Sequence, residues 1–110
     1  MSSLPGPFIR FQKDQPAIAR AYEDLGKAVH AAGPLDEKTR ALVKLAVSIG
    51  AQREGAVHAH TRKAVAVGAA PDAIRHAAYL ALPTIGFPGM MAALSWVNDI
   101  LDDAEGGAGR

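Results

Sequence analysis

The fold is decided by the stretch LAVSIGAQREGAVHAHTRKAVAVGAAPDAIRHAAYLALPTIGFP, residues 45–88. Alanine, the strongest helix former, is its commonest residue. Gly68 suits the end of a helix, and Pro71 suits the first position of the next one. We therefore expect one helix from residue 53 to about residue 67 and a second that begins at Pro71 and is ended or kinked by Pro83.

Three further helices are expected, two before this stretch and one after it. Upstream, Asp14 and Asp36 are suited to cap two helices, each of which ends near a glycine. Downstream, the segment PTIGFPG should form a loop, and Pro88 should start the last helix. The first and last helices carry apolar stripes at helical spacing, which are Ile18, Tyr22, Leu25 and Val29 in the first and Met91, Leu94, Val97 and Leu101 in the last.

These elements predict an all-α fold, a compact array of about five helices. We expect an N-terminal arm over residues 1–13, one helical domain over residues 14–103 and a disordered tail over residues 104–110. The arm should be extended, because it holds two prolines and a glycine and shows no helical periodicity. The helix over residues 36–50 is apolar on more than one face, which is typical of a central helix or of one shared between subunits. We therefore expect a homo-oligomer.

Composition narrows the classes of function and partner. The formal net charge is +1 and no basic run is present, so no nucleic-acid partner is expected. The absence of cysteine excludes disulfides, thiol catalysis and cysteine-ligated metals. No apolar run approaches the ~20 residues of a membrane span, and the N-terminus lacks the apolar centre of a signal peptide. We therefore expect no membrane partner and a cytoplasmic location.

The segment REGAVHAHTRKA, residues 53–64, concentrates the polar candidates for a site. At about 100° per residue, Glu54 and His58 share one face of a helix, whereas His60 points about 160° away from His58. His60 shares its more apolar face with Arg53. Two histidines placed in this way cannot chelate one ion, so we expect no metal site. From the residues alone, His60 on this apolar face is better explained as a hydrogen-bonded core histidine than as a functional group.

The chain resembles the carboxymuconolactone decarboxylase and alkylhydroperoxidase D-like family over about residues 35–100. The resemblance is carried by the order and spacing of LAVS at 45–48, the HxxxA pattern from His60 to Ala64, Gly68-Ala69, and the step from Asp72 to Ile74. It implies an all-α, alkylhydroperoxidase D-like fold that assembles into trimers, hexamers or related rings.

The peroxidase branch of this family uses a CxxC pair, a downstream histidine and a glutamate on the preceding helix. The resemblance places the two cysteines at Arg53 and Ala56 and the glutamate at Ala41, so only His60 of that relay remains. Without a thiolate, the family's peroxide reduction is not expected.

The decarboxylase branch uses neither cofactor nor redox cysteine, and it implies loss of carbon dioxide from a small lactone acid. On that reading, His60 is the acid–base group and Arg53 holds the substrate carboxylate. Glu54 and His58 are further catalytic candidates, either on the same pocket through a neighbouring subunit or as a pair that only supports the helix. Three residues near the PTIGFPG segment are candidates for substrate binding, namely Thr84, Phe87 and Trp96. The alternative function is a non-catalytic oligomeric module that binds a ligand or a protein.

Overall fold

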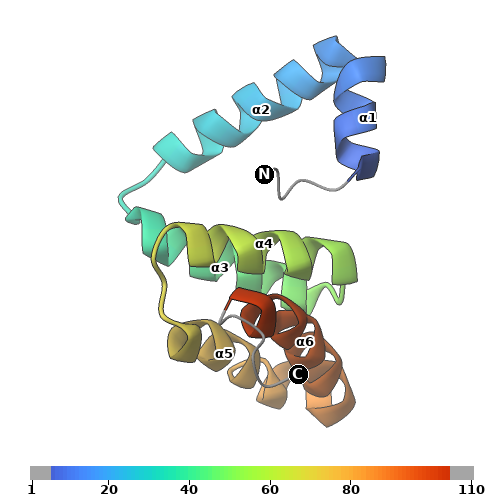
Figure 1. Ribbon diagram of the computed structural model, residues 1–110. Helices are drawn as coiled ribbons and strands as arrows, with labels where there is room; N and C mark the ends of the chain where they lie inside the picture. Colours follow the sequence, from blue (N-terminus) through green and yellow to red (C-terminus); the bar gives the residue numbers. More distant parts are fainter. Residues whose placement is uncertain (1–5, 105–110) are drawn as a thin grey trace. The chain divides into compact units, whose positions relative to one another are not determined.

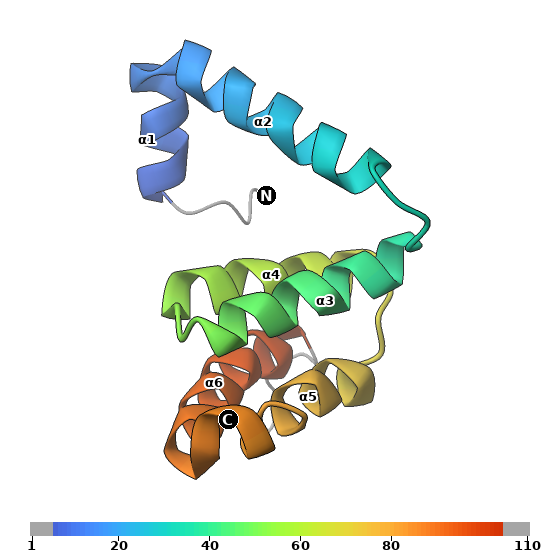
Figure 2. The ribbon, with the colours of Figure 1, turned by 180° about the vertical axis from the view of Figure 1, so that it is seen from behind.

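The computed structural model describes residues 6–104, which form two compact units (Figures 1 and 2). The first unit contains α1 and α2 and ends at Leu35, and the second begins at Asp36 and contains α3 to α6. The described residues contain six helices and no strand, which confirms the predicted all-α class with one helix more than expected. The boundary between the units lies inside the range 14–103 that the sequence predicts as one domain.

The first unit corrects the prediction of an extended arm. Residues Gly6–Asp14 form helix α1, and Pro7 is tolerated there because the first turn of a helix has no partner for its backbone N–H. The apolar side chains of Phe8 and Ile9 are half-buried. Residues 1–5 of the predicted arm lie outside the described residues.

Helix α2 spans Pro16–Ala31 and begins differently from the prediction. Asp14 does not cap it, because Asp14 is the last residue of α1 and its Oδ2 atom lies 3.2 Å from Nε of Arg10. Gln15 occupies the N-cap position without a side-chain hydrogen bond, and Pro16 follows in the first turn as expected.

The second unit begins with an antiparallel pair of helices, α3 (Glu37–Gly50) and α4 (Glu54–Ala66). The predicted cap at Asp36 is confirmed, since its Oδ1 atom accepts a hydrogen bond of 2.8 Å from the backbone N–H of Thr39. This bond is the first cause that lowers the pKa of the Asp36 carboxyl. A three-residue turn joins the two helices and places them side by side (Figure 2).

Helices α5 (Pro71–Tyr79) and α6 (Leu82–Ala104) form a second layer against α3 and α4 (Figures 1 and 2). The expected PTIGFPG loop is largely helical, which corrects the prediction. Only Gly86, with φ 85° and ψ 165°, leaves the helical conformation. Pro88 therefore stands in the first turn of the segment that follows the break, where a missing N–H is harmless.

α6 continues to Ala104, so the predicted tail begins one residue too early. Residues 105–110 of that tail lie outside the described residues.

The core of the second unit lies between its two layers. It is aliphatic, in keeping with an aromatic content of 5% in the whole chain. Its fully buried apolar residues are Leu45, Ile49, Val57, Ala64, Ile74, Ala78, Ala93, Val97 and Leu101. Two polar residues are buried among them. Ser48 donates to the carbonyl of Leu45 and Thr61 to that of Val57, each over 2.7 Å, so neither hydroxyl lacks a partner.

Within residues 6–104, no single helix is long and apolar enough to cross a membrane. Helices α5 and α6 meet that test of length and composition only when they are taken together, and the angle between them is 118°.

Candidate functional site

The two histidines of the central segment face different helices. Nε2 of His58 lies 2.9 Å from Oδ2 of Asp99 on α6. His60, two positions later on α4, is half-buried and senses the charge of Lys44 on α3. The divergence expected from helical geometry thus separates His58, which contacts α6, from His60, which feels the charge of Lys44 on α3.

His60 lies in a group of basic side chains. Burial lowers the pKa of its imidazole, and the charges of Lys63 and Lys44 lower it further. Lys44 is itself half-buried, and burial, Lys63 and Arg40 lower the pKa of its ammonium group. We call these four residues, Arg40, Lys44, His60 and Lys63, the basic cluster. Its electrostatic field favours a neutral imidazole and attracts an anion.

The helical hairpin explains why the basic cluster forms. Lys44 lies eight residues before Gln52 in the turn between α3 and α4, and His60 lies eight residues after it. Antiparallel helices therefore bring the two side chains to the same level. Lys63 follows His60 by three residues on α4, which places it on the neighbouring turn of the same face. Lys44 was not among the predicted site residues. The signal for its position is the equal separation of Lys44 and His60 from the turn at Gln52.

Arg53 and Glu54 lie at the start of α4, at a distance from the basic cluster. Arg53 is the N-cap residue and is exposed, and its backbone N–H donates to the carbonyl of Ser48 over 3.2 Å. Seven residues separate Arg53 from His60, which is two helical turns or about 10 Å along the axis. Glu54 is also exposed and stands in the first turn, where a carboxylate is favourable to the helix dipole.

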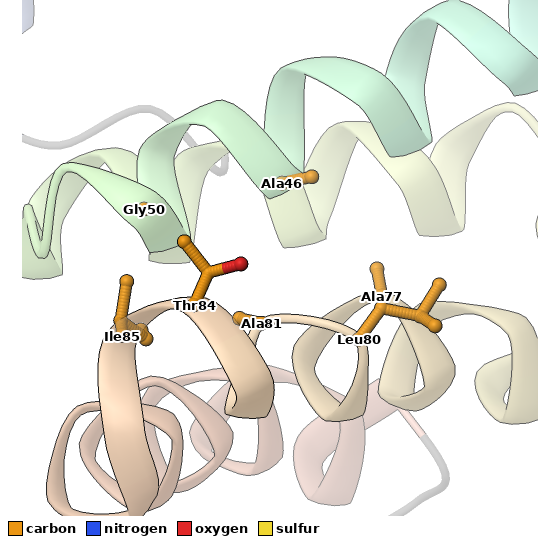
Figure 3. Close-up of a pocket in the computed structure, with 7 residues that line it drawn as sticks. All are labelled: Ala46, Gly50, Ala77, Leu80, Ala81, Thr84 and Ile85. Atoms are coloured by element: carbon orange, nitrogen blue, oxygen red, sulfur yellow. The ribbon is translucent and has the colours of Figure 1, made fainter.

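The three residues expected to bind substrate are not gathered around one site. Thr84 lines a hollow of about 220 Å³ between α3, α5 and the first turn of α6, together with Ala46, Gly50, Ala77, Leu80, Ala81 and Ile85. Figure 3 shows Thr84 and Ala77 directed toward the side of α3 that carries Ala46. Phe87 is 62% exposed beside the break at Gly86, and Trp96 packs against the core.

A second hollow continues the first along α3 and α5. It has a volume of about 310 Å³ and is lined by Thr39, Leu42, Val43, Ala46, Ala73, His76, Ala77 and Leu80. Because both hollows share Ala46, Ala77 and Leu80, we describe them together as the α3–α5 groove. His60 lines neither hollow. The groove is apolar, and its polar side chains are Thr39, His76 and Thr84.

His76 is exposed in the last turn of α5, and its side chain lines the wall of this groove. The signal for its position is its spacing on α5, since residues 73, 77 and 80 share its helical face. Among the residues that the structure describes, no three His, Asp or Glu side chains gather closely enough to hold a metal ion.

Comparison with known families identifies the chain. The sequence model of the Carboxymuconolactone decarboxylase family matches residues 16–99, which include all of α2 to α5 and most of α6. Comparisons with curated proteins and with solved structures gave no match. The family match covers well over half of the chain and agrees with its helical fold, so the chain belongs to the carboxymuconolactone decarboxylase family.

Proposed function

We propose that the chain is a small, cofactor-free acid–base enzyme that acts on a small organic acid or lactone acid. The observation that carries the proposal is the half-buried His60, whose pKa is lowered by burial and by the charges of Lys63 and Lys44. A carboxylate is the natural ligand of two neighbouring cations, and an imidazole beside it is placed to exchange a proton.

The electrostatics of the basic cluster support a specific role for each member. Lys44 and Lys63 hold the carboxylate of the substrate, and His60 moves the proton. Without a ligand, burial and the two cations lower the pKa of His60 and favour its neutral form. A bound anion offsets those charges and raises the pKa again, so substrate binding itself prepares the imidazole to accept and return a proton.

In a decarboxylation, the bond between the ring carbon and the carboxylate breaks and carbon dioxide leaves. The electron pair stays on the carbon, which then takes up a proton from the imidazolium of His60. This assignment replaces Arg53 with the two lysines as the carboxylate-binding group, because Arg53 lies two turns away along α4. Glu54 and His58 have no part in this step.

The absence of cysteine excludes the thiol-dependent peroxide reduction that the peroxidase branch of the family carries out. The chain has no thiolate to attack a peroxide, so we expect no thiol-dependent peroxidase activity. A peroxide-consumption assay with a dithiol reductant checks this, and turnover above the rate without protein would contradict it.

Binding is tested first, with succinate as a defined dicarboxylate probe. In NMR titrations of the imidazole protons, succinate should raise the pKa of His60, and Lys63→Gln should weaken that rise. Arg62→Gln is the matched control, because it removes a cation at the adjacent position of α4 and should leave the rise intact. If the pKa of His60 is unchanged at saturating succinate, Lys44 and Lys63 do not bind a carboxylate near His60, and this part of the proposal is wrong.

Turnover is tested with a panel of small lactone acids and β-keto acids, with carbon dioxide release as the readout. For any substrate found, His60→Ala should lower kcat by about 10²- to 10⁴-fold, the usual contribution of a positioned acid–base group. His58→Ala should retain most of the activity, because His58 faces Asp99. Equal losses in both variants would contradict the assignment of the proton transfer to His60.

One observation favours a second candidate, the non-catalytic binding module. The two hollows of the α3–α5 groove are lined mainly by apolar side chains and do not include His60. A surface of that kind suits an apolar partner better than a small anion. If the panel yields no turnover and succinate does not bind, this candidate replaces the enzyme.

A further inference from the structure

Lys44 is a half-buried lysine on α3, and its burial follows from its position on the helix. It lies between Ala41, about one turn earlier, and Ser48, about one turn later, on the same side of α3. Ala41 packs against the hydrophobic core and Ser48 is 5% exposed. The side chain of Lys44 therefore starts from the packed flank of the helix, and burial withdraws part of its amine from water.

Arg40, His60 and Lys63 complete the basic cluster to which this amine belongs. Arg40 precedes Lys44 by about one turn of α3, and its Nε atom is buried. His60 and Lys63 come from α4, which lies beside α3 (Figure 2). All four residues belong to the second unit, so their arrangement is set by the packing of α3 against α4.

These surroundings act on the amine of Lys44 in one direction. Burial lowers its pKa, and the charges of Lys63 and Arg40 lower the pKa further. An ordinary lysine is neutral at pH 7 in roughly one molecule in 2,500, and a lower pKa increases that share. Only the neutral amine has a lone pair that can attack carbon. A lysine that is withdrawn from water beside other cations is therefore an activated nucleophile.

We propose that Lys44 is a catalytic nucleophile whose amine forms an imine with the keto group of a small β-keto acid. This inference rests on the proposed function, because it uses the same His60 and the same cations, and it selects β-keto acids as the substrate class. The carbonyl group of a lactone is an ester and does not form an imine. With a β-keto acid, Lys63 and Arg40 hold the substrate carboxylate while Lys44 reacts.

The reaction is complete with the acid, Lys44, His60 and water. The nitrogen of Lys44 attacks the keto carbon, and the adduct loses water with a proton from the imidazolium of His60, which leaves an iminium ion. The bond from the α-carbon to the carboxylate then breaks, carbon dioxide leaves, and the electron pair moves toward the iminium nitrogen to form an enamine.

Proton transfer and hydrolysis return the enzyme to its starting state. The α-carbon of the enamine takes a proton from the imidazolium of His60, which restores the iminium ion. Water then hydrolyses this ion, releases a ketone and regenerates the amine of Lys44. Hydrolysis returns one proton to His60 and solvent supplies the other, so each turnover consumes one proton and releases one carbon dioxide.

Reductive trapping tests the imine in the full chain. Acetoacetate is the probe, and sodium cyanoborohydride reduces an iminium ion to a stable amine that peptide mass mapping locates. The chain has five lysines, which are Lys13, Lys27, Lys38, Lys44 and Lys63. The other four lysines report the rate of non-specific labelling, and we expect Lys44 to be labelled roughly tenfold faster than any of them.

Three variants separate the nucleophile from its neighbours. Lys44→Arg keeps the positive charge and removes the nucleophile, so it should abolish the fast labelling. Lys38→Arg is the matched control, because Lys38 is an exposed lysine of the same helix, and it should leave the labelling of Lys44 unchanged. Lys63→Gln should slow the labelling of Lys44 severalfold, because it removes one of the charges that activate the amine. Far-UV circular dichroism establishes that each variant retains its helices.

A second measurement is independent of acetoacetate. Reductive methylation with ¹³C-formaldehyde labels every lysine, and the NMR signal that is missing from Lys44→Arg belongs to Lys44. In a pH titration, this signal should report the lowest pKa of the five lysines. A pKa for Lys44 equal to those of the exposed lysines would overturn the proposal.

Two results of the trapping experiment would also overturn it, namely equal labelling of all five lysines and fast labelling that survives Lys44→Arg. These failures are distinct from a failure of the proposed function. If succinate raises the pKa of His60 and Lys44 is not labelled, the anion site stands and the covalent step is wrong. If Lys44 is labelled rapidly and His60→Ala releases carbon dioxide as fast as the parent, the imine stands and the proton transfer by His60 is wrong.

Discussion

His58 on α4 and Asp99 on α6 are joined across the two layers of the second unit, with Nε2 and Oδ2 2.9 Å apart. The side chain of His58 is 23% exposed and that of Asp99 is 58% exposed. Water therefore screens the pair, and its contribution to stability should be close to that of a surface ion pair. The contact orients His58 toward α6, on the side of α4 opposite to the basic cluster.

The first prediction concerns the strength of that contact. In a double-mutant cycle of His58→Ala and Asp99→Ala, we expect a coupling of about 0.5 kcal/mol in the free energy of unfolding. Urea denaturation followed by circular dichroism supplies the four values. A coupling above about 2 kcal/mol would mean that the pair is far better shielded from water than its exposure indicates.

The second prediction follows from His60. Its pKa in the folded chain lies below the ordinary value of 6.5, because of burial and of the charges of Lys63 and Lys44. Below pH 6.5 the unfolded chain then binds more protons than the folded one, so stability rises with pH in that window and is lost as the pH falls. His60→Gln removes the titration, so its unfolding free energy should fall less between pH 7 and pH 5 than that of the parent.

The control for this experiment is His76→Gln, which removes a histidine of the α3–α5 groove. It should leave the His60-dependent part of the pH profile in place. A parent and a His60→Gln variant with parallel profiles between pH 5 and pH 7 would contradict the lowered pKa. Ionic strength is a further check, because added salt should weaken the influence of the two lysines and leave that of burial.

The third prediction uses the two glycines that have a positive φ within residues 6–104. Gly68 ends α4 with φ 87° and Gly86 breaks α6 with φ 85° and ψ 165°. A side chain is strained in both conformations, so Gly68→Ala and Gly86→Ala should each lower the free energy of unfolding by about 1–2 kcal/mol. Gly55→Ala is the control, because Gly55 is helical and a Cβ there meets no atom within 4 Å. It should be neutral or slightly stabilising.

The ends of helices α3 and α5 that carry clear capping signals were predictable from the sequence. Asp36 caps α3, Gly50 is its last residue and Pro71 is the first residue of α5, because each signal acts through local backbone chemistry. The PTIGFPG segment was misjudged because Pro83 and Pro88 both fall in first turns, where proline does not oppose a helix. The same reason explains α1, whose only helix-breaking residues, Gly6 and Pro7, are its first two.

The candidate site was predictable only in part, since helical geometry assigns faces but not neighbours. It separated His58 from His60, but it paired His60 with Arg53 on a shared face. Their separation along the helix axis makes that pairing poor, whereas the tertiary hairpin supplies Lys44 from α3. Residues brought together by a turn are found only when the position of that turn is known. Here the turn is centred on Gln52, whose backbone adopts a positive φ of 55°.

The fourth prediction tests the role of this turn. Gln52 adopts φ 55°, and its Nε2 atom donates to the carbonyls of Ile49 and Gly89 over 3.0 and 3.1 Å. These bonds fasten the turn between α3 and α4 to α6, and they offset the strain of a left-handed backbone. Gln52→Ala loses both bonds and keeps the strain, so it should lower the free energy of unfolding by about 1–2 kcal/mol. Gln52→Gly also loses the bonds but relieves the strain, so it should be about 1 kcal/mol more stable than Gln52→Ala. Urea denaturation of the two variants measures the difference directly, and a glycine variant no more stable than the alanine variant would show that the turn is not strained at this residue.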